Sequence, residues 1–94
     1  MRELEAIRQE LDAVDRELVT LFERRMALAR EVAAYKLARD LPVLDSSREE
    51  QVLSSRAAML QNPALAQDVR RLWTTLMALS RAEQEKYIRE VERK

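Results

Sequence analysis

Residues 3–38, ELEAIRQELDAVDRELVTLFERRMALAREVAAYKLA, decide the fold of this 94-residue chain. Apolar side chains recur every three or four residues through this stretch, as they do on one face of an α-helix. The spacing predicts one amphipathic helix, which at ~1.5 Å per residue would be roughly 50 Å long. The apolar stripe consists of Leu4, Ile7, Leu11, Val14, Leu18, Leu21, Leu28, Val32 and Tyr35.

Arg25 interrupts the apolar stripe. A guanidinium at a buried position is costly unless an anionic group meets it. Lys36 lies eleven residues further on, and therefore only ~20° around the helix axis from Arg25. Ala29, Val32 and Ala33 lie between the two cations and leave space beside the helix. The two cations predict a site for an anionic ligand, whereas an arginine that snorkels to solvent or pairs with a core carboxylate is the structural alternative.

The length of this helix predicts a second copy of the chain. It exceeds the diameter of a compact domain of this size, so one chain cannot cover the stripe. A copy related by a two-fold axis is the simplest cover. Arg8 lies roughly 42 Å along the axis from Lys36, too far to share a small ligand with it. In an antiparallel pair of these helices, Arg8 of one chain could reach the region of Arg25 and Lys36 in the other.

A shorter second helix is expected after a break in the chain. Pro42 disfavours helical geometry at the residue before it, so the first helix ends in this region. Either Asp45 or Ser46 can cap the second helix, and Ser46-x-x-Glu49 matches a capping box. The apolar residues that follow predict three to four turns.

Asn62 and Pro63 begin a third helix, as its N-cap and first helical residue, and the apolar pattern continues to about Val91. Glycine is absent, which removes most hairpin turns and argues against a sheet protein. We expect an all-α fold of three helices, long, short and long, in a single domain over residues 1–94 with no fused catalytic or regulatory module. Two such chains would form an intertwined homodimer.

The composition excludes several classes of function. Without His or Cys the chain has no histidine base, Ser-His triad, thiol nucleophile or disulfide. The Asp45-x-Ser47-x-Glu49 pattern lacks the glycine of a calcium loop, and no metal site is expected. A formal net charge of +0 gives no field that recruits nucleic acid or an anionic membrane. No spanning segment or signal peptide is visible, so we expect a cytoplasmic protein.

Polar residues on otherwise apolar faces complete the candidate site. Individually they are explicable as helix caps, first-turn charges or side chains that satisfy each other. With Arg25 and Lys36 they describe a pocket for a small dicarboxylate that bears a hydroxyl, because arginine forks bind carboxylates bidentately. A neutral amide beside an ammonium can also stabilise a developing oxyanion without proton transfer. These polar residues are Asp45, Arg48, Glu49, Ser80 and Gln84.

Motifs over nearly the whole chain point to a known family. They are Ile7-Arg8 and Asp15, Arg24-Arg25-x-x-Leu28-Ala29-x-x-Val32, Lys36, Pro42-Val43-x-Asp45-x-x-Arg48-Glu49, and Ser80-Arg81-x-x-Gln84. This pattern resembles that of the all-helical chorismate mutases, which are intertwined homodimers of three-helix chains. Each of their two sites borrows one arginine from the partner, and the resemblance implies that Arg8 has this role here.

The resemblance implies rearrangement of chorismate to prephenate, a Claisen-type sigmatropic step toward phenylalanine and tyrosine, without a cofactor or covalent intermediate. Arg25 and Arg8 of the partner subunit would bind the substrate carboxylates, helped by Ser80. Lys36 would contact a carboxylate and the breaking ether oxygen, and Gln84 would donate to the same oxygen. Catalysis would then consist of holding the reactive conformer and stabilising the charge that develops on the ether oxygen.

The remaining residues carried over by the resemblance surround the substrate ring. Glu49 would accept a hydrogen bond from the ring hydroxyl, with the backbone at Asp45 nearby. Arg48 would complete the charge balance around the pocket. The expected apolar walls are Val32, Val52 and Met77.

Two other functions compete with this one. An isochorismate-pyruvate lyase has the same fold and a similar Arg/Lys/Gln set, but it lacks the pair Arg48-Glu49, whose presence favours the mutase. A non-catalytic helical dimer that regulates another shikimate-pathway enzyme would have no reason to keep four such residues on inward faces at once, namely Arg25, Lys36, Glu49 and Gln84.

The chain departs from the family pattern at two places. Asp40-Leu41 stands where the family often has a glycine before the proline, and Ser46-Ser47 stands where a bulkier apolar residue often follows the aspartate. Both departures affect how the linker closes over the site.

Overall fold

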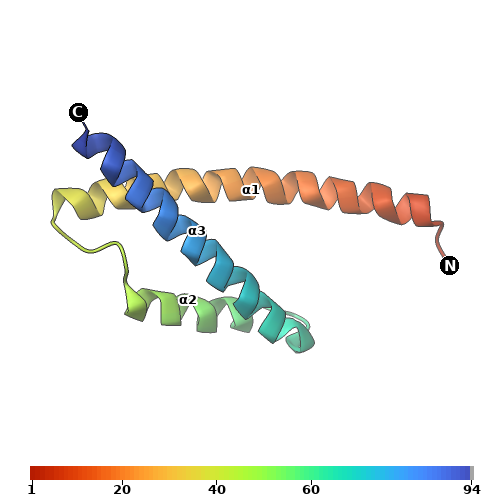
Figure 1. The fold of residues 1–94 in the computed structure, drawn as a ribbon. Helices are drawn as coiled ribbons and strands as arrows, with labels where there is room; N and C mark the ends of the chain where they lie inside the picture. The colour runs from red at the N-terminus through yellow and green to blue at the C-terminus, as the bar shows by residue number, and fades with distance from the viewer. Residues whose placement is uncertain (94) are drawn as a thin grey trace.

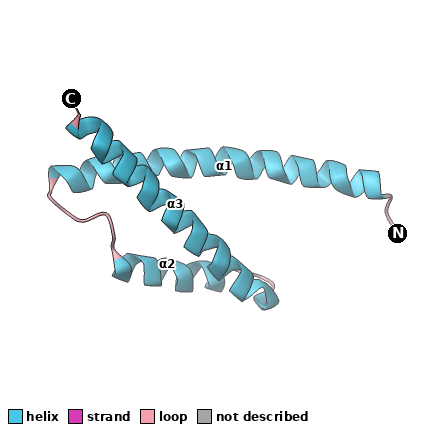
Figure 2. Cartoon of the chain, in the orientation of Figure 1, coloured by secondary structure: helices cyan, strands magenta, loops and turns pink. Residues whose placement is uncertain are grey.

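The computed structural model describes residues 1–93 and, within them, three α-helices and one short 3₁₀ turn (Figures 1 and 2). Helix α1 spans Leu4–Ala38, α2 spans Ser46–Ala58 and α3 spans Ala66–Glu92, with the 3₁₀ turn η1 at Pro63–Leu65. No residue in this range belongs to a strand, so the predicted all-α, long–short–long order is confirmed. None of these helices has both the length and the apolar character needed to cross a membrane.

Helix α1 ends in a turn built on a left-handed residue. Asp40 has a φ of 55°. The Leu41 amide donates to the Lys36 carbonyl at 2.9 Å and the Asp40 amide donates to the Leu37 carbonyl at 3.3 Å. These two hydrogen bonds form a Schellman motif, in which the left-handed position usually carries glycine. The helix therefore ends through its own capping turn before Pro42 is reached.

The starts of the other two helices differ in part from the prediction. Asp45 is the N-cap of α2, because its Oδ1 accepts from the Arg48 amide at 3.1 Å. Ser46 is already helical, so the capping box predicted from Ser46-x-x-Glu49 is wrong. The Asn62 side chain accepts from the Ala64 amide, but it caps η1 rather than a continuous helix. Helix α3 begins three residues later than Pro63, after this tighter turn.

Helix α3 packs against both α1 and α2, while α1 and α2 do not pack against each other within the described residues. Figure 1 shows α3 running diagonally, crossing the C-terminal half of α1 near its own C-terminal end and crossing α2 near its own N-terminal end. Ala29 and Ala33 are the two buried residues of α1. Small side chains at a helix contact reduce the distance between the two axes.

Arg30 of α1 forms ion pairs with two glutamates of α3 beside this crossing. Its Nη1 donates to Glu83 Oε1 at 3.1 Å and its Nη2 donates to Glu90 Oε2 at 2.6 Å. The guanidinium also lies 5.0 Å from the centre of the Tyr87 ring. The hydrogen bonds to Glu90 and Glu83 raise the pKa of Arg30. This cluster holds the register of α3 against α1.

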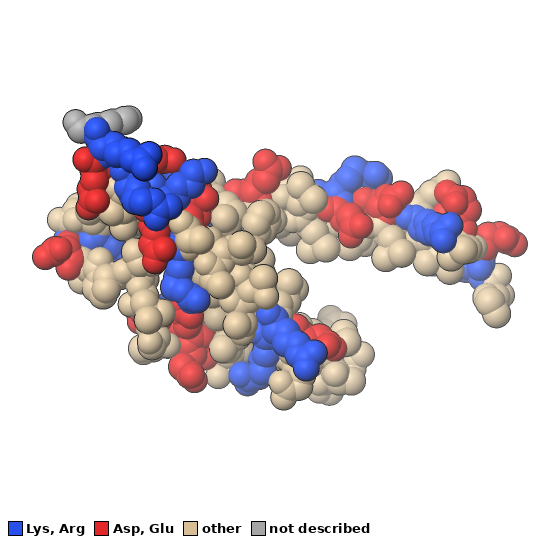
Figure 3. Space-filling model, viewed as in Figure 1, with Lys and Arg blue, Asp and Glu red and all other residues tan. Residues whose placement is uncertain are grey.

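The N-terminal half of α1 projects away from the other helices (Figure 1). The radius of gyration is 16.9 Å, whereas a compact domain of this length has about 12 Å. Figure 3 shows acidic and basic side chains interspersed along this projection, beside a strip of uncharged surface. Every stripe residue on it is at least 37% exposed, namely Leu4, Ile7, Leu11, Val14, Leu18 and Leu21. One chain therefore leaves the apolar stripe uncovered.

Replacing Asp40 tests the left-handed turn. At such a position glycine is favoured over alanine by about 1 kcal/mol, whereas inside a helix alanine is favoured by a similar amount. We therefore expect Asp40→Gly to have a higher Tm than Asp40→Ala. Glu85 is exposed within α3, and there we expect the opposite order, with a higher Tm for Glu85→Ala than for Glu85→Gly. Thermal unfolding followed by circular dichroism compares the two pairs, and a higher Tm for Asp40→Ala would contradict the turn.

Candidate active site

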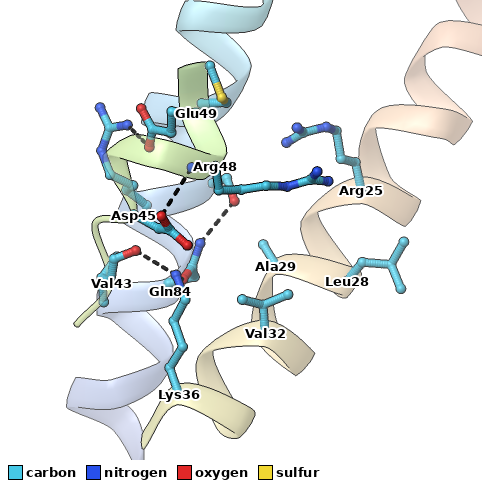
Figure 4. A pocket seen from close by; sticks show the side chains of 13 residues that line it. Arg25, Leu28, Ala29, Val32, Lys36, Val43, Asp45, Arg48, Glu49 and Gln84 are labelled. Atoms are coloured by element: carbon cyan, nitrogen blue, oxygen red, sulfur yellow. Dashed lines mark hydrogen bonds and ion pairs between the residues drawn. The ribbon is translucent and has the colours of Figure 1, made fainter. Parts of the chain in front are cut away.

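A pocket of about 310 Å³ lies between the three helices and the linker that joins α1 to α2 (Figure 4). Small-molecule sites start at about this size. Seven of the eight site residues predicted from the sequence line it, namely Arg25, Lys36, Asp45, Arg48, Glu49, Ser80 and Gln84. The other lining residues are Leu28, Ala29, Val32, Val43, Met77 and Arg81. The structure therefore brings together polar side chains that are up to 59 positions apart in the sequence, from Arg25 to Gln84.

The apolar wall differs in part from the prediction. Val32 and Met77 line the pocket as expected. Val52 is only 3% exposed but does not line it, so its predicted place in the wall is wrong. Val52 lies on α2, which packs against α3, and there it belongs to the core. Ala33, expected to leave space beside the cations, is fully buried and likewise does not line the pocket.

Lys36 and Gln84 form a connected polar group at one end of the pocket. Lys36 Nζ donates to the Val43 carbonyl at 2.6 Å and to Gln84 Oε1 at 3.1 Å. Gln84 Nε2 donates to Ser80 Oγ at 3.1 Å, so these two side chains satisfy each other in part, as the structural alternative for them allows. The Lys36 ammonium fixes the orientation of the Gln84 amide. As a donor, it requires that the amide oxygen, rather than the amide nitrogen, point toward Lys36.

Both of these donors keep an unused N–H. Within residues 1–93, Lys36 uses two of its three N–H groups in hydrogen bonds, and the Gln84 amide nitrogen uses one of its two. Gln84 is 6% exposed. A buried donor without an acceptor is costly, so these positions favour a ligand that accepts hydrogen bonds.

Arg25 carries a charge that the described residues leave uncompensated. It makes no hydrogen bond or ion pair with residues 1–93, so it does not pair with a core carboxylate. Burial lowers the pKa of its guanidinium, and the nearby charges of Arg56 and Arg48 lower it further. In Figure 4 Arg25 and Arg48 point toward each other across the pocket. An anion between them would relieve this repulsion.

Glu49 is paired across the pocket wall with Arg81, whose Nη1 donates to Glu49 Oε2. No role is predicted for Arg81 from the sequence, although it lies three residues before Gln84 and therefore on the same face of α3. The Val43 carbonyl was also missed, because a backbone acceptor leaves no signal in residue type. With Arg81 included, four cationic and two anionic side chains line the pocket.

The lining residues suit a small dicarboxylate better than a neutral or cationic ligand, because their positive charge is in excess. Guanidinium groups bind carboxylates, while the ammonium and the amide can donate to a further oxygen. Within residues 1–93 no group of three or more His, Cys, Asp or Glu side chains is arranged to hold a metal ion.

Arg8 is the one predicted site residue that does not line the pocket. It is exposed on the projecting part of α1. Along the helix axis it is about 26 Å from Arg25, beyond the reach of an arginine side chain. The prediction that Arg8 serves a second chain therefore remains a prediction.

Arg25→Met tests the uncompensated charge. We expect the ligand-free variant to have a higher Tm than the wild type, because the repulsion from Arg48 and Arg56 is removed. Malonate, a small dicarboxylate, should stabilise the wild type by about 1.4 kcal/mol at ten times its Kd. The variant should lose most of this response.

The matched control is Arg89→Met, which removes an exposed cation from α3 and should keep the full response to malonate. Thermal unfolding at constant ionic strength, with chloride replacing malonate, provides the measurement. An unchanged malonate response in Arg25→Met would show that the anion binds elsewhere.

Comparison with known proteins agrees with this chemistry. The sequence model of the family described as chorismate mutase type II matches residues 7–85. The chain is 32% identical to the T-protein of Haemophilus influenzae over 69 residues, which are 73% of this chain and 18% of that protein. It is 37% identical to the T-protein of Enterobacter agglomerans over 73 residues, 73% of this chain and 20% of that protein.

A third relative is the bifunctional chorismate mutase/prephenate dehydratase of Enterobacter agglomerans, 44% identical over 50 residues, 53% of this chain and 13% of that protein. The chain thus spans between 13% and 20% of the length of these curated relatives. No solved structure matches it. With more than half of its residues matched by the family model, the chain belongs to the chorismate mutase type II family.

Proposed function

We propose that the chain is a chorismate mutase, which converts chorismate to prephenate in the synthesis of phenylalanine and tyrosine. The observation that carries this proposal is the pocket itself, where unpaired cations face an amide and an ammonium that each keep a free N–H. Chorismate has two carboxylates, a ring hydroxyl and an ether oxygen, so it offers an acceptor for each of these donors. Family membership supports the same reaction.

In this proposal the arginines bind the carboxylates. Arg25 takes one of them, because it has no carboxylate partner among residues 1–93. Arg8 of the partner subunit and Ser80 complete the carboxylate contacts, and Arg48 balances the charge across the pocket. Binding both carboxylates holds the flexible substrate in the folded conformer that reacts, which removes much of the entropic part of the barrier.

Lys36 and Gln84 stabilise the transition state. As the ether bond breaks, negative charge develops on its oxygen, and both side chains have an N–H left to donate to it. A preorganised donor of this kind contributes about 2.7–4 kcal/mol. Glu49 accepts a hydrogen bond from the ring hydroxyl, with the backbone at Asp45 nearby. No proton needs to move, so the lack of histidine is no obstacle.

A second copy of the chain completes the site in this proposal. The exposed stripe on the projecting half of α1 needs an apolar cover of the same length, and the corresponding half of another α1 has that length. The same arrangement brings Arg8 to the other chain's pocket. The cytoplasmic location and the single domain over residues 1–94 stay predictions from the sequence.

Product identification tests the reaction. We expect the protein to consume chorismate and to yield prephenate, which acid converts to phenylpyruvate. Isochorismate should remain unchanged, because Glu49 and Arg48 both line the pocket, whereas the lyases lack this pair. Salicylate and pyruvate from isochorismate would instead identify the lyase. A folded protein that turns over neither substrate would favour a non-catalytic binding module.

Gln84→Glu tests the donor to the ether oxygen. At neutral pH a carboxylate there would repel the developing charge, so we expect a loss of at least tenfold in kcat/KM. The activity should recover partly as the pH falls toward ~4.3, because a protonated carboxyl can donate. Rates from about pH 4 to pH 8 provide the test, with Gln84→Ala as the control whose defect stays constant across this range. A pH-independent defect in Gln84→Glu would contradict the contact.

Mixed dimers test the shared site. Arg8→Ala and Lys36→Ala chains should each be inactive alone. Their heterodimer combines one intact Arg8 with one intact Lys36, which restores one site of two, so we expect about half of the wild-type activity. The control pairs Lys36→Ala with Arg25→Met, both from one chain's own part of the site, and should stay inactive. Differently tagged chains purified together provide the heterodimers, and no recovery in the first pair would contradict the shared site.

A further inference from the structure

We propose that Arg81 is a positioning residue, which holds the Glu49 carboxylate in place for the substrate ring hydroxyl and neutralises its charge. The inference rests on the proposed function. Arg81 lies in the middle of α3 and Glu49 in the first turn of α2, so their ion pair joins the two helices. Both side chains line the pocket, and they are 31% and 26% exposed, respectively.

The position of Glu49 creates an electrostatic problem. A carboxylate in a pocket for a dicarboxylate repels its ligand, and partial burial strengthens the repulsion. Arg48, the neighbouring residue, forms no ion pair with Glu49 within residues 1–93, and its Nη1 donates instead to Gln51 Oε1 at 2.8 Å. Arg81 is the cation that pairs with Glu49 among the described residues. It therefore provides the compensating charge.

The geometry of the pair leaves one carboxylate oxygen available. Arg81 donates to Glu49 Oε2, while Oε1 has no hydrogen-bond partner within residues 1–93. A fixed carboxylate with one open oxygen is a specific acceptor for a hydroxyl. Because Arg81 directly follows Ser80, the ion pair also sets the distance between this acceptor and the donors on α3. Arg81 thus acts on the substrate through Glu49.

A purely structural tie between α2 and α3 is the alternative, and substrate discrimination separates the two roles. We compare chorismate with its ring O-methyl ether, which cannot donate to Glu49. The wild type should prefer chorismate. Arg81→Met should lower kcat/KM for chorismate roughly tenfold to a hundredfold, the range for one charge-assisted hydrogen bond. The same variant should lose the preference over the methyl ether, as should Glu49→Gln.

A double-mutant cycle supplies the second readout. If Arg81 acts through Glu49, the combined variant Arg81→Met/Glu49→Gln should be no slower than Glu49→Gln alone, within about twofold. Arg81→Lys retains a cation and should recover most of the activity. Should Arg81→Met fail to fold, Arg81→Gln replaces it in the cycle. Arg89→Met serves as the control that removes an exposed cation from the same helix.

The outcomes separate this inference from the proposed function. Wild-type protein that does not turn over chorismate overturns both. Active wild type with multiplicative effects of the two substitutions, or with full discrimination retained in Arg81→Met, overturns the role of Arg81 alone. Loss of discrimination together with non-additive effects supports it.

Discussion

The crossing of α3 over α1 determines where every part of the pocket lies. Helix α3 is the helix that packs against α1, whose two buried residues are Ala29 and Ala33. Arg30 then fastens α3 from one side through Glu83 and Glu90. Because Gln84 follows Glu83 directly on α3, the same register brings Gln84 to the Lys36 ammonium on the pocket side. A larger residue at the crossing would separate the two donors that the proposed mechanism needs together.

Charge repulsion in the pocket lowers the stability of the chain, and the apolar core that must compensate for it is small. Arg25 and Arg48 point toward each other, and their mutual repulsion together with the burial of Arg25 disfavours the charged pair. The buried apolar residues of the described chain are only Ala29, Ala33, Val52 and Met77. So small a core offers little to offset the repulsion. A bound dianion would remove the repulsion, and a second chain over the projecting stripe would enlarge the core. In the proposed dimer, the substrate would therefore offset the repulsion between the arginines, and the partner chain would compensate for the small core.

The sequence predicts most of the fold because its strongest pattern is local. Helix α1 continues for about ten turns without a glycine or proline, and its apolar stripe, interrupted at Arg25, fits only a helical periodicity. Seven pocket residues were also predictable, since charged or amide side chains on apolar faces need a specific reason.

The features that escaped prediction depend on register between elements or on the backbone. Whether Glu49 meets Arg81 depends on how α2 lies against α3, and a single sequence does not specify that. Val52 was misplaced for the same reason. The sequence predicts that Pro42 ends α1, whereas the left-handed turn at Asp40 already ends the helix before Pro42.

A crystal structure with an oxabicyclic dicarboxylate, which resembles the chair-like transition state, would test the central claim most directly. Our account predicts one carboxylate on Arg25, the ether oxygen within hydrogen-bond distance of Lys36 Nζ and Gln84 Nε2, and Arg8 of the partner subunit on the other carboxylate. An inhibitor bound outside this pocket, or bound there without a cation on either carboxylate, would contradict the account.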